Sequence, residues 1–195
     1  ESVIRDRTAG GVRVAGAART ITPELAEVAQ TAIAADLSTP EGAASAVGTA
    51  LAEFGGLDIL VNNAGYGSYG AIEDVPIDEA RRQFEVNVFG LGRLTQLVTP
   101  HMRTQGSGTI INISSMGGRL TTPLGGWYHA TKYAVEARSD ALRMELRPFG
   151  IDVVVVEPGG IRTEWYAIAA DHLEATAEGS AGSRPGPGRR GRLEP

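Results

Sequence analysis

The stretch "IDVVVVEPG", residues 151–159, decides the fold of this chain of 195 residues. Its valines follow one another without alternating polar residues, so a strand built from them is apolar on both faces. Strands of this kind are typical of parallel sheets that helices cover, whereas a half-exposed antiparallel strand alternates. Other short apolar runs share this character, at residues 11–18, 31–36, 57–63 and 108–115. We therefore predict that these runs form a parallel sheet.

Helical stretches separate the strands, at residues 40–56, 77–102 and 127–146. The first begins at a proline and ends at two glycines, as helices commonly do. The alternation of strand and helix predicts an α/β fold with right-handed crossovers. In the second stretch apolar residues recur at steps of three and four, along one helix face. These residues are Phe84, Val88, Leu91, Leu94 and Val98.

The composition excludes several classes of protein. A net charge of -5 argues against nucleic acid as a partner. Without cysteine, the chain has no disulfide, no thiolate nucleophile and no cysteine-bound zinc. No stretch is long and apolar enough to cross a bilayer, and the N-terminus does not resemble a signal peptide, so we expect a cytoplasmic protein. The patterning suits one domain over residues 1–178, and the Gly/Pro/Arg-rich residues 179–195 are predicted to be disordered.

Tyr128 and Lys132 are the first candidates for catalysis, and Lys132 is the only lysine in the chain. Positions four residues apart share a helix face, so both side chains are expected to point the same way. A nearby ammonium favours the phenolate and lowers the pKa of a tyrosine, which makes the pair a plausible proton donor and acceptor. A compact ammonium also fits where the broad fork of an arginine does not. The alternative is chance, because this spacing occurs in many helices.

Other polar residues follow the predicted strands, where ligands of α/β sheets gather. Ser115 ends one strand and suits a substrate oxygen, or it is an ordinary turn serine. "LVNNAG", residues 60–65, suits a backbone that passes close to a ligand, or it is a plain turn. Asp36 either accepts a bond from a ligand or caps the next helix. Asn87 lies inside a predicted helix, where it bonds backbone or water or faces solvent.

Together these residues resemble the short-chain dehydrogenase/reductase family over roughly residues 11–166. The resemblance rests on motifs in the family's order and at similar spacing. They are "NNAG" at 62–65, "NVFG" at 87–90, "ISS" at 113–115, "YHATK" at 128–132 and "PGGIRT" at 158–163.

The resemblance implies a Rossmann-type doubly wound parallel sheet with helices on both faces. It also implies reversible hydride transfer between a nicotinamide cofactor and an alcohol or ketone. Tyr128 would be the acid/base, Lys132 would lower its pKa and bind the nicotinamide ribose, and Ser115 would orient the substrate oxygen. Asn87 would support a proton-relay water. The implied cofactor-binding residues are Asp36 and Leu37 at the adenine, Asn63 and Ala64 near the adjoining ribose, and Pro158, Gly159, Ile161 and Thr163 on the nicotinamide side.

The end of the first predicted strand favours NADP over NAD as the cofactor. NAD-binding relatives usually carry an acidic residue there, which accepts a hydrogen bond from the ribose 2′-OH. This chain has Ala17, Ala18 and then Arg19, whose cation suits a 2′-phosphate. The alternative is that Arg19 is simply an exposed arginine and that NAD is bound.

The family's glycine-rich phosphate loop is not found, because no T-G-x-x-x-G-x-G pattern occurs in the sequence. We expect that loop and the family's first strand upstream of Glu1, with the strand lying between those of residues 11–18 and 57–63. Three hypotheses follow: a dehydrogenase, an inactive remnant that cannot hold the cofactor pyrophosphate, or an epimerase or dehydratase on the same scaffold. "NNAG" and "PGGIRT" favour the first over the third.

The substrate is expected to be a small alcohol or ketone. Apolar residues near the predicted pocket suggest an apolar one, although such residues are as often ordinary packing. The resemblance also implies a homodimer or homotetramer. The pocket residues in question are Tyr66, Tyr69, Leu120, Leu124 and Trp127.

Overall fold

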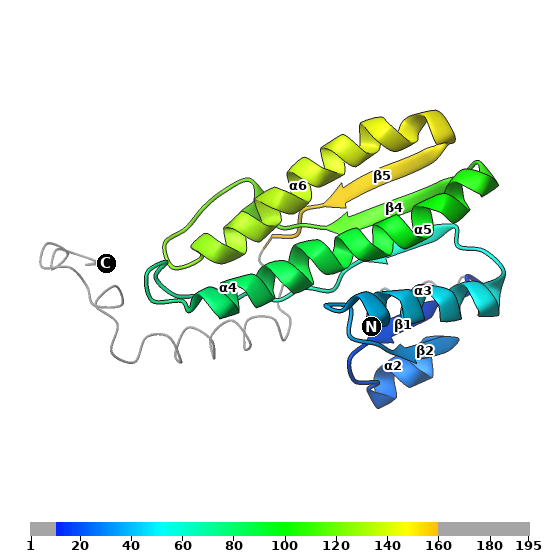
Figure 1. Cartoon of the computed structure of the whole chain (residues 1–195), viewed down its shortest axis with the longest axis horizontal. Helices are drawn as coiled ribbons and strands as arrows, with labels where there is room; N and C mark the ends of the chain where they lie inside the picture. Colours follow the sequence, from blue (N-terminus) through cyan, green and yellow to red (C-terminus); the bar gives the residue numbers. More distant parts are fainter. Residues whose placement is uncertain (1–10, 160–195) are drawn as a thin grey trace, which may run out of the picture.

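The computed structural model of the chain describes residues 11–159 and contains two parallel sheets (Figure 1). In the smaller sheet β1 (Ala15–Ala18) pairs with β2 (Thr31–Ala34). In the larger sheet β4 (Gly108–Ile113) lies between β3 (Ile59–Asn62) and β5 (Ile151–Val156). The predicted strands and their parallel pairing are therefore confirmed, but within residues 11–159 they form two sheets and not the single sheet predicted.

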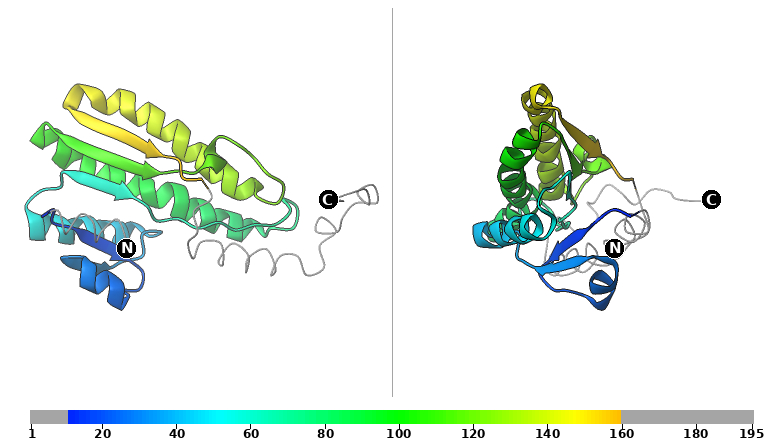
Figure 2. Two further views of the ribbon diagram at one scale, coloured as in Figure 1. Left: turned by 180° about the vertical axis from the view of Figure 1, so that it is seen from behind. Right: turned by 90° about the vertical axis from the view of Figure 1, so that its right-hand side faces the viewer.

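β1 and β3 are both edge strands. Within residues 11–159 each has a hydrogen-bonded strand on one side only. These are the two strands between which a further strand was expected from the sequence. The arrows of both sheets point toward the same end of the molecule (Figures 1 and 2). The carboxyl ends of all the strands, and the polar residues that follow them, therefore share one edge.

The first helices are fixed by their caps. α3 (Pro40–Phe54) begins after Thr39, whose Oγ1 accepts a hydrogen bond from the Gly42 amide at 3.0 Å, and it ends at Gly55 with φ 75°. A left-handed residue at a helix C-terminus favours glycine, so the glycine stop predicted this end correctly. A shorter helix, α2 (Pro23–Val28), was not predicted. It is too short to show a helical period.

The prediction of one continuous α-helix over residues 77–102 is wrong. The stretch consists of α4 (Ile77–Phe84), a π-helical segment (Glu85–Gly90) and α5 (Leu91–Gln105). Its predicted apolar face is nevertheless buried, at Val88, Leu94 and Val98 among others. The apolar pattern continues across the π-helical segment, so no pattern in the sequence indicates this segment. Segments of this type often mark functional sites.

α6 (Gly126–Leu146) is the longest helix among the described residues and carries the "YHATK" motif in its first turns. A short 3₁₀ turn (Met116–Gly118) follows β4, and a loop then leads into α6. A second 3₁₀ turn (Arg147–Phe149) and Gly150, with φ 70°, end the helix. The proline and glycine signals at its end therefore predicted the boundary correctly.

The main core lies between the larger sheet and the helices α3, α5 and α6 (Figure 2). α3 also packs against β2, so it contributes to the cores of both sheets. Within residues 11–159, helices cover one face of the larger sheet, and the other face exposes apolar side chains. These are Ile59, Val61, Val154 and Val156, each at least 40% exposed.

Candidate active site

The four candidate catalytic residues, from three separate segments, meet at the carboxyl edge of the larger sheet. Ser115 follows β4, Asn87 lies in the π-helical segment, and Tyr128 and Lys132 lie in the first turns of α6. Tyr128 hydrogen-bonds the Ser115 side chain, and the Lys132 Nζ lies 5.8 Å from the centroid of the Tyr128 ring.

Tyr128 is buried and packs against aromatic neighbours. Its ring centroid lies 5.7 Å from that of Tyr69, and its exposed fraction is 5%. Burial raises the pKa of Tyr128, and the hydrogen bond with Ser115 lowers it by less. The pKa of Tyr128 is therefore raised overall, whereas the sequence led us to expect that Lys132 would lower it. The reason is that desolvation of the phenolate outweighs the favourable contacts, so the phenol stays protonated at neutral pH.

Lys132 occupies a confined space. Its Nζ donates a hydrogen bond to the carbonyl of Ile113 at 2.9 Å. Gly65 lies directly beside it, and a Cβ at that glycine would be 3.8 Å from Nζ. Burial lowers the pKa of Lys132 to about 8, while the charge of Glu136 raises it. A planar guanidinium is wider than an ammonium, so we expect this space to accept lysine more readily than arginine.

Asn87 is fully bonded inside the π-helical segment. Its Oδ1 accepts from the Tyr66 amide at 3.0 Å, and its Nδ2 donates to the Tyr66 carbonyl at 2.8 Å and to Thr131 Oγ1 at 3.1 Å. A Cβ at Gly65 would lie 3.1 Å from Asn87 Oδ1. The solvent-facing alternative for Asn87 is therefore wrong. The asparagine fixes the loop after β3 against α6, next to Lys132.

Most of the predicted cofactor-binding residues lie at the carboxyl ends of the strands, where they are accessible. Asn63 and Ala64 are exposed just beyond β3, and Arg19 is exposed beyond β1. The amide of Met116, beside Ser115, donates to the Pro158 carbonyl at 3.1 Å, which brings Pro158 and Gly159 to the catalytic cluster. Ile161 and Thr163 lie outside the described residues.

Asp36 follows β2 and is exposed, as a ligand-binding residue would be. It does not cap α3, because Thr39 does. Its Oδ1 accepts from the backbone amide and the hydroxyl of Ser38, and these bonds lower the pKa of Asp36, with smaller contributions from Arg19 and Arg82. The carboxylate is therefore ionised at neutral pH. The backbone of the next residue, Leu37, lies against Gly90, where a Cβ would be 2.7 Å from the Leu37 carbonyl oxygen.

Sequence reasoning quoted Asn62 and His129 only as members of motifs and missed the contacts that two groups of polar residues make near the site. Asn62 and Asn112 are buried behind the strand ends, where Asn62 Nδ2 donates to Asn112 Oδ1 at 2.9 Å. His129 accepts from the Thr122 amide through Nε2, and its Nδ1 donates to the Gly117 carbonyl, both at 3.0 Å. This ring therefore fixes the loop between β4 and α6. The signal in the sequence for this close contact was the glycine at position 117. In the structure, a Cβ at Gly117 would lie 2.8 Å from the Nδ1 of His129.

Comparison with known proteins identifies the family. The sequence model of the short chain dehydrogenases matches residues 8–173. The chain belongs to this family. Among the described residues, no helix is long and apolar enough to cross a membrane.

Two curated relatives are named as reductases. The chain is 50% identical over 118 residues to an NADPH-dependent 3-dehydrocapnine reductase of Ornithobacterium rhinotracheale, covering 58% of this chain and 42% of the relative. It is 41% identical over 128 residues to a 3-ketodihydrosphingosine reductase of Bacteroides thetaiotaomicron, covering 66% and 48%. The chain thus spans about half the length of the curated relatives it matches.

A solved structure supports the Rossmann-type fold of this short-chain dehydrogenase. The 3-ketoacyl-(acyl-carrier-protein) reductase of Brucella melitensis, complexed with NADH, superposes with a TM-score of 0.79 at 32% identity. The match covers 91% of this chain and 76% of that one.

Proposed function

We propose that this short-chain dehydrogenase interconverts a ketone and an alcohol with NADP(H), and that Tyr128 is its acid/base. The observation that carries the proposal is the meeting of Ser115, Tyr128, Lys132 and Asn87 at the edge where polar residues follow the strands. Two relatives named as reductases support the reaction class.

The chemistry follows from the two hydroxyl groups. In reduction, the Ser115 and Tyr128 hydroxyls donate hydrogen bonds to the substrate carbonyl oxygen, which polarises the carbonyl. As a hydride reaches the carbonyl carbon, Tyr128 gives its proton to the oxygen and the alcohol forms. A buried phenol that stays protonated at neutral pH suits this donor role. Lys132 stabilises the phenolate that remains, and Asn87 keeps the loop beside Lys132 in place.

The residues at the strand ends fit a nicotinamide cofactor, which supplies the hydride when bound. We assign Arg19, Asp36, Leu37, Asn63 and Ala64 to its adenosine half. Pro158, Gly159, Ile161 and Thr163 are assigned to its nicotinamide half, together with Tyr128 and Lys132. The accessibility of Arg19 and Asn63 and the close passage of Gly65 past Asn87 support this assignment.

Arg19 tests the choice between the two cofactors. Its cation would pair with the 2′-phosphate that NADPH has and NADH lacks. We expect Arg19→Ala to weaken NADPH binding by roughly ten- to a hundredfold, the loss of one charge-assisted contact. Binding of NADH should stay the same. Fluorescence titration of both cofactors measures this. Tighter binding of NADH than NADPH by the parent protein, or an unchanged affinity for NADPH in the variant, would contradict it.

Tyr128→Phe tests the catalytic assignment. Loss of a general acid should lower turnover by about 10²–10⁴-fold, with little change in fold because only one oxygen is removed. Tyr133→Phe is the matched control, because Tyr133 lies on the same helix and is 44% exposed. NADPH oxidation is followed with a panel of ketones that includes 3-ketodihydrosphingosine, the ketone in the name of one relative.

The assay uses the chain 1–195 and also that chain joined to the flanking segments of the Bacteroides relative, because the chain spans about half of such proteins. Turnover of Tyr128→Phe within a few-fold of the parent would reject the assignment. If the parent neither binds the cofactor nor shows turnover in either form, the inactive remnant is favoured. A small apolar substrate and a cytoplasmic location remain expectations from the sequence, and assembly as a homodimer or homotetramer remains an expectation from the family resemblance.

A further inference from the structure

A buried carboxylate lies one helical turn beyond Lys132. Glu136 is on α6, and its side chain is only 5% exposed. Residues four apart on a helix are neighbours on one face, so Glu136 and Lys132 lie on the same side of α6. Carboxylates are seldom buried unless they are paired, because removing the charge from water is costly. The burial of Glu136 therefore needs an explanation.

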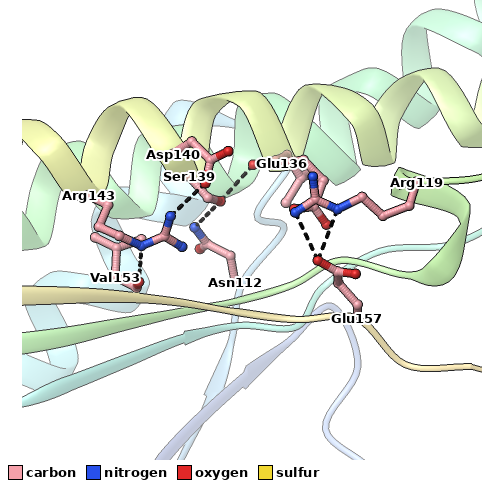
Figure 3. A network of polar contacts seen from close by, with 9 residues as sticks. Asn112, Arg119, Glu136, Ser139, Asp140, Arg143, Val153 and Glu157 are labelled. Atoms are coloured by element: carbon pink, nitrogen blue, oxygen red, sulfur yellow. Dashed lines mark hydrogen bonds and ion pairs between the residues drawn. The ribbon is translucent and has the colours of Figure 1, made fainter.

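Arg119 provides part of that explanation (Figure 3). Its Nη2 lies 3.0 Å from Glu136 Oε2, and its Nε and Nη2 both donate to Glu157 Oε1 at 3.1 Å. One guanidinium thus connects the loop after Ser115, α6 and the end of β5. Two carboxylates share a single cation, so this cluster keeps an excess negative charge.

The carboxylate of Glu136 has few other partners. Among the described residues, neither of its oxygens accepts a hydrogen bond, and the contact with Arg119 is an ion pair without hydrogen-bond geometry. The backbone at Gly118 packs tightly on it, since a Cβ there would lie 2.9 Å from Glu136 Cγ. A buried charge with so few donors interacts strongly with any other charge nearby.

Lys132 is the other nearby charge. Among residues 11–159, its one hydrogen-bond acceptor is the uncharged carbonyl of Ile113 on β4. A Cβ at Gly65 would lie close to both the Lys132 Nζ and the neutral amide of Asn87 in the π-helical segment. The ring centroid of Tyr128 on α6 lies 5.8 Å from the Lys132 Nζ. Glu136 is the carboxylate whose charge opposes the effect of burial on the Lys132 pKa. Asp140, the next acid on α6, pairs with Arg143 and also acts on Arg119.

We propose that Glu136, held in place by Arg119, is a positioning residue that keeps the buried Lys132 amine in its charged form. The catalytic consequence rests on the function proposed above, because an ammonium is needed beside Tyr128 and at the cofactor ribose. Glu136 itself touches neither group in this assignment. It acts through Lys132, from the side of α6 that faces away from the solvent.

Because Lys132 is the only lysine, its protonation can be measured directly. In the chain 1–195 labelled with ¹³Cε,¹⁵Nζ-lysine, NMR shows one lysine side chain, and a pH titration of its signal gives its pKa. We expect a value near 8 in the parent chain. Glu136→Gln keeps the shape and removes the charge, so the Lys132 pKa should fall by about 0.5–1 unit. Glu145→Gln, at an exposed glutamate of the same helix, should leave it unchanged.

A second variant covers the case in which Glu136→Gln does not fold, which tryptophan fluorescence melting would reveal. Glu157 is more exposed than Glu136. In Glu157→Gln the charge of Arg119 is no longer shared, so Arg119 pairs only with Glu136. The Lys132 pKa should then fall as well, but by less. A Lys132 pKa that is the same in the parent and in the folded charge variants overturns the proposal.

Turnover separates this proposal from the proposed function. If both hold, the alkaline loss of turnover begins at lower pH in Glu136→Gln than in the parent or in Glu145→Gln. A shifted Lys132 pKa with an unshifted pH profile of turnover would reject the role of Lys132 in catalysis. The effect of Glu136 on Lys132 would still stand.

Discussion

Lys132 shows how a confined site changes the properties of a residue that the sequence alone made conspicuous. Its amine donates to a single carbonyl at 2.9 Å and the residue is 8% exposed, so the side chain has lost most of its hydration. The same burial raises the pKa of Tyr128 and lowers that of Lys132, because in both cases the charged form is the one that water stabilised. Spacing predicted that these residues meet, but not which effect dominates.

The lowered pKa of Lys132 predicts a dependence of stability on pH. The folded value is about 8 and the unfolded value about 10.5, so between these pH values the unfolded chain binds more protons than the folded one. Stability therefore rises as the pH increases through this window, and the contribution of Lys132 amounts to about 3 kcal/mol across it. Below pH 8 the charged amine destabilises the fold by that amount.

Lys132→Met keeps the apolar stem and removes the titrating group. Urea unfolding at pH 7.5 and at pH 9.5 should show a rise in the free energy of unfolding for the parent and a smaller rise or none for the variant. The variant should also be more stable than the parent at pH 7.5. Equal pH dependence in the two proteins would contradict the burial of the charged amine.

At the scale of elements, the prediction succeeded where a local signal coincides with a structural boundary. The glycine at position 55 marks the end of α3 because its φ of 75° is costly for other residues. β5 follows directly from its run of valines. The helix α2 was missed because six residues are too few to show a period. The π-helical segment was missed because its apolar residues fit an α-helical pattern equally well.

The site illustrates the same limit. Tyr128, Lys132 and Ser115 lie where spacing and strand ends placed them, but the partners of Asn87 come from segments distant in sequence. A pattern within one element cannot show that its amide bonds the backbone of Tyr66. Likewise, nothing around Glu136 in the sequence indicates that its charge is buried. That follows only from how the loop with Arg119 folds over α6.

At the scale of the whole molecule, the two sheets are joined mainly through one helix. α3 contributes Ala43 and Val47 to the core under the larger sheet, and Ala46 and Ala50 to the core beside β2. The edge strands β1 and β3 do not pair with each other. Loops and α3 must therefore carry any cooperativity between the part of the molecule around β2 and the part that holds the catalytic cluster.

This arrangement predicts that a cavity beside β2 destabilises the distant catalytic half. Ile33 on β2 is 7% exposed, so Ile33→Ala should cost about 2–5 kcal/mol. Trp127, at the start of α6, reports on the other half once the second tryptophan is replaced (Trp165→Phe). If α3 couples the halves, the melting transition seen by Trp127 should move down by roughly 4–20 °C.

Ile77→Ala, at a 52% exposed isoleucine, is the control and should shift this transition little. A Trp127 transition that is the same in the parent and in Ile33→Ala would show that the two sheets unfold independently, and that packing on a shared helix does not make them one cooperative unit.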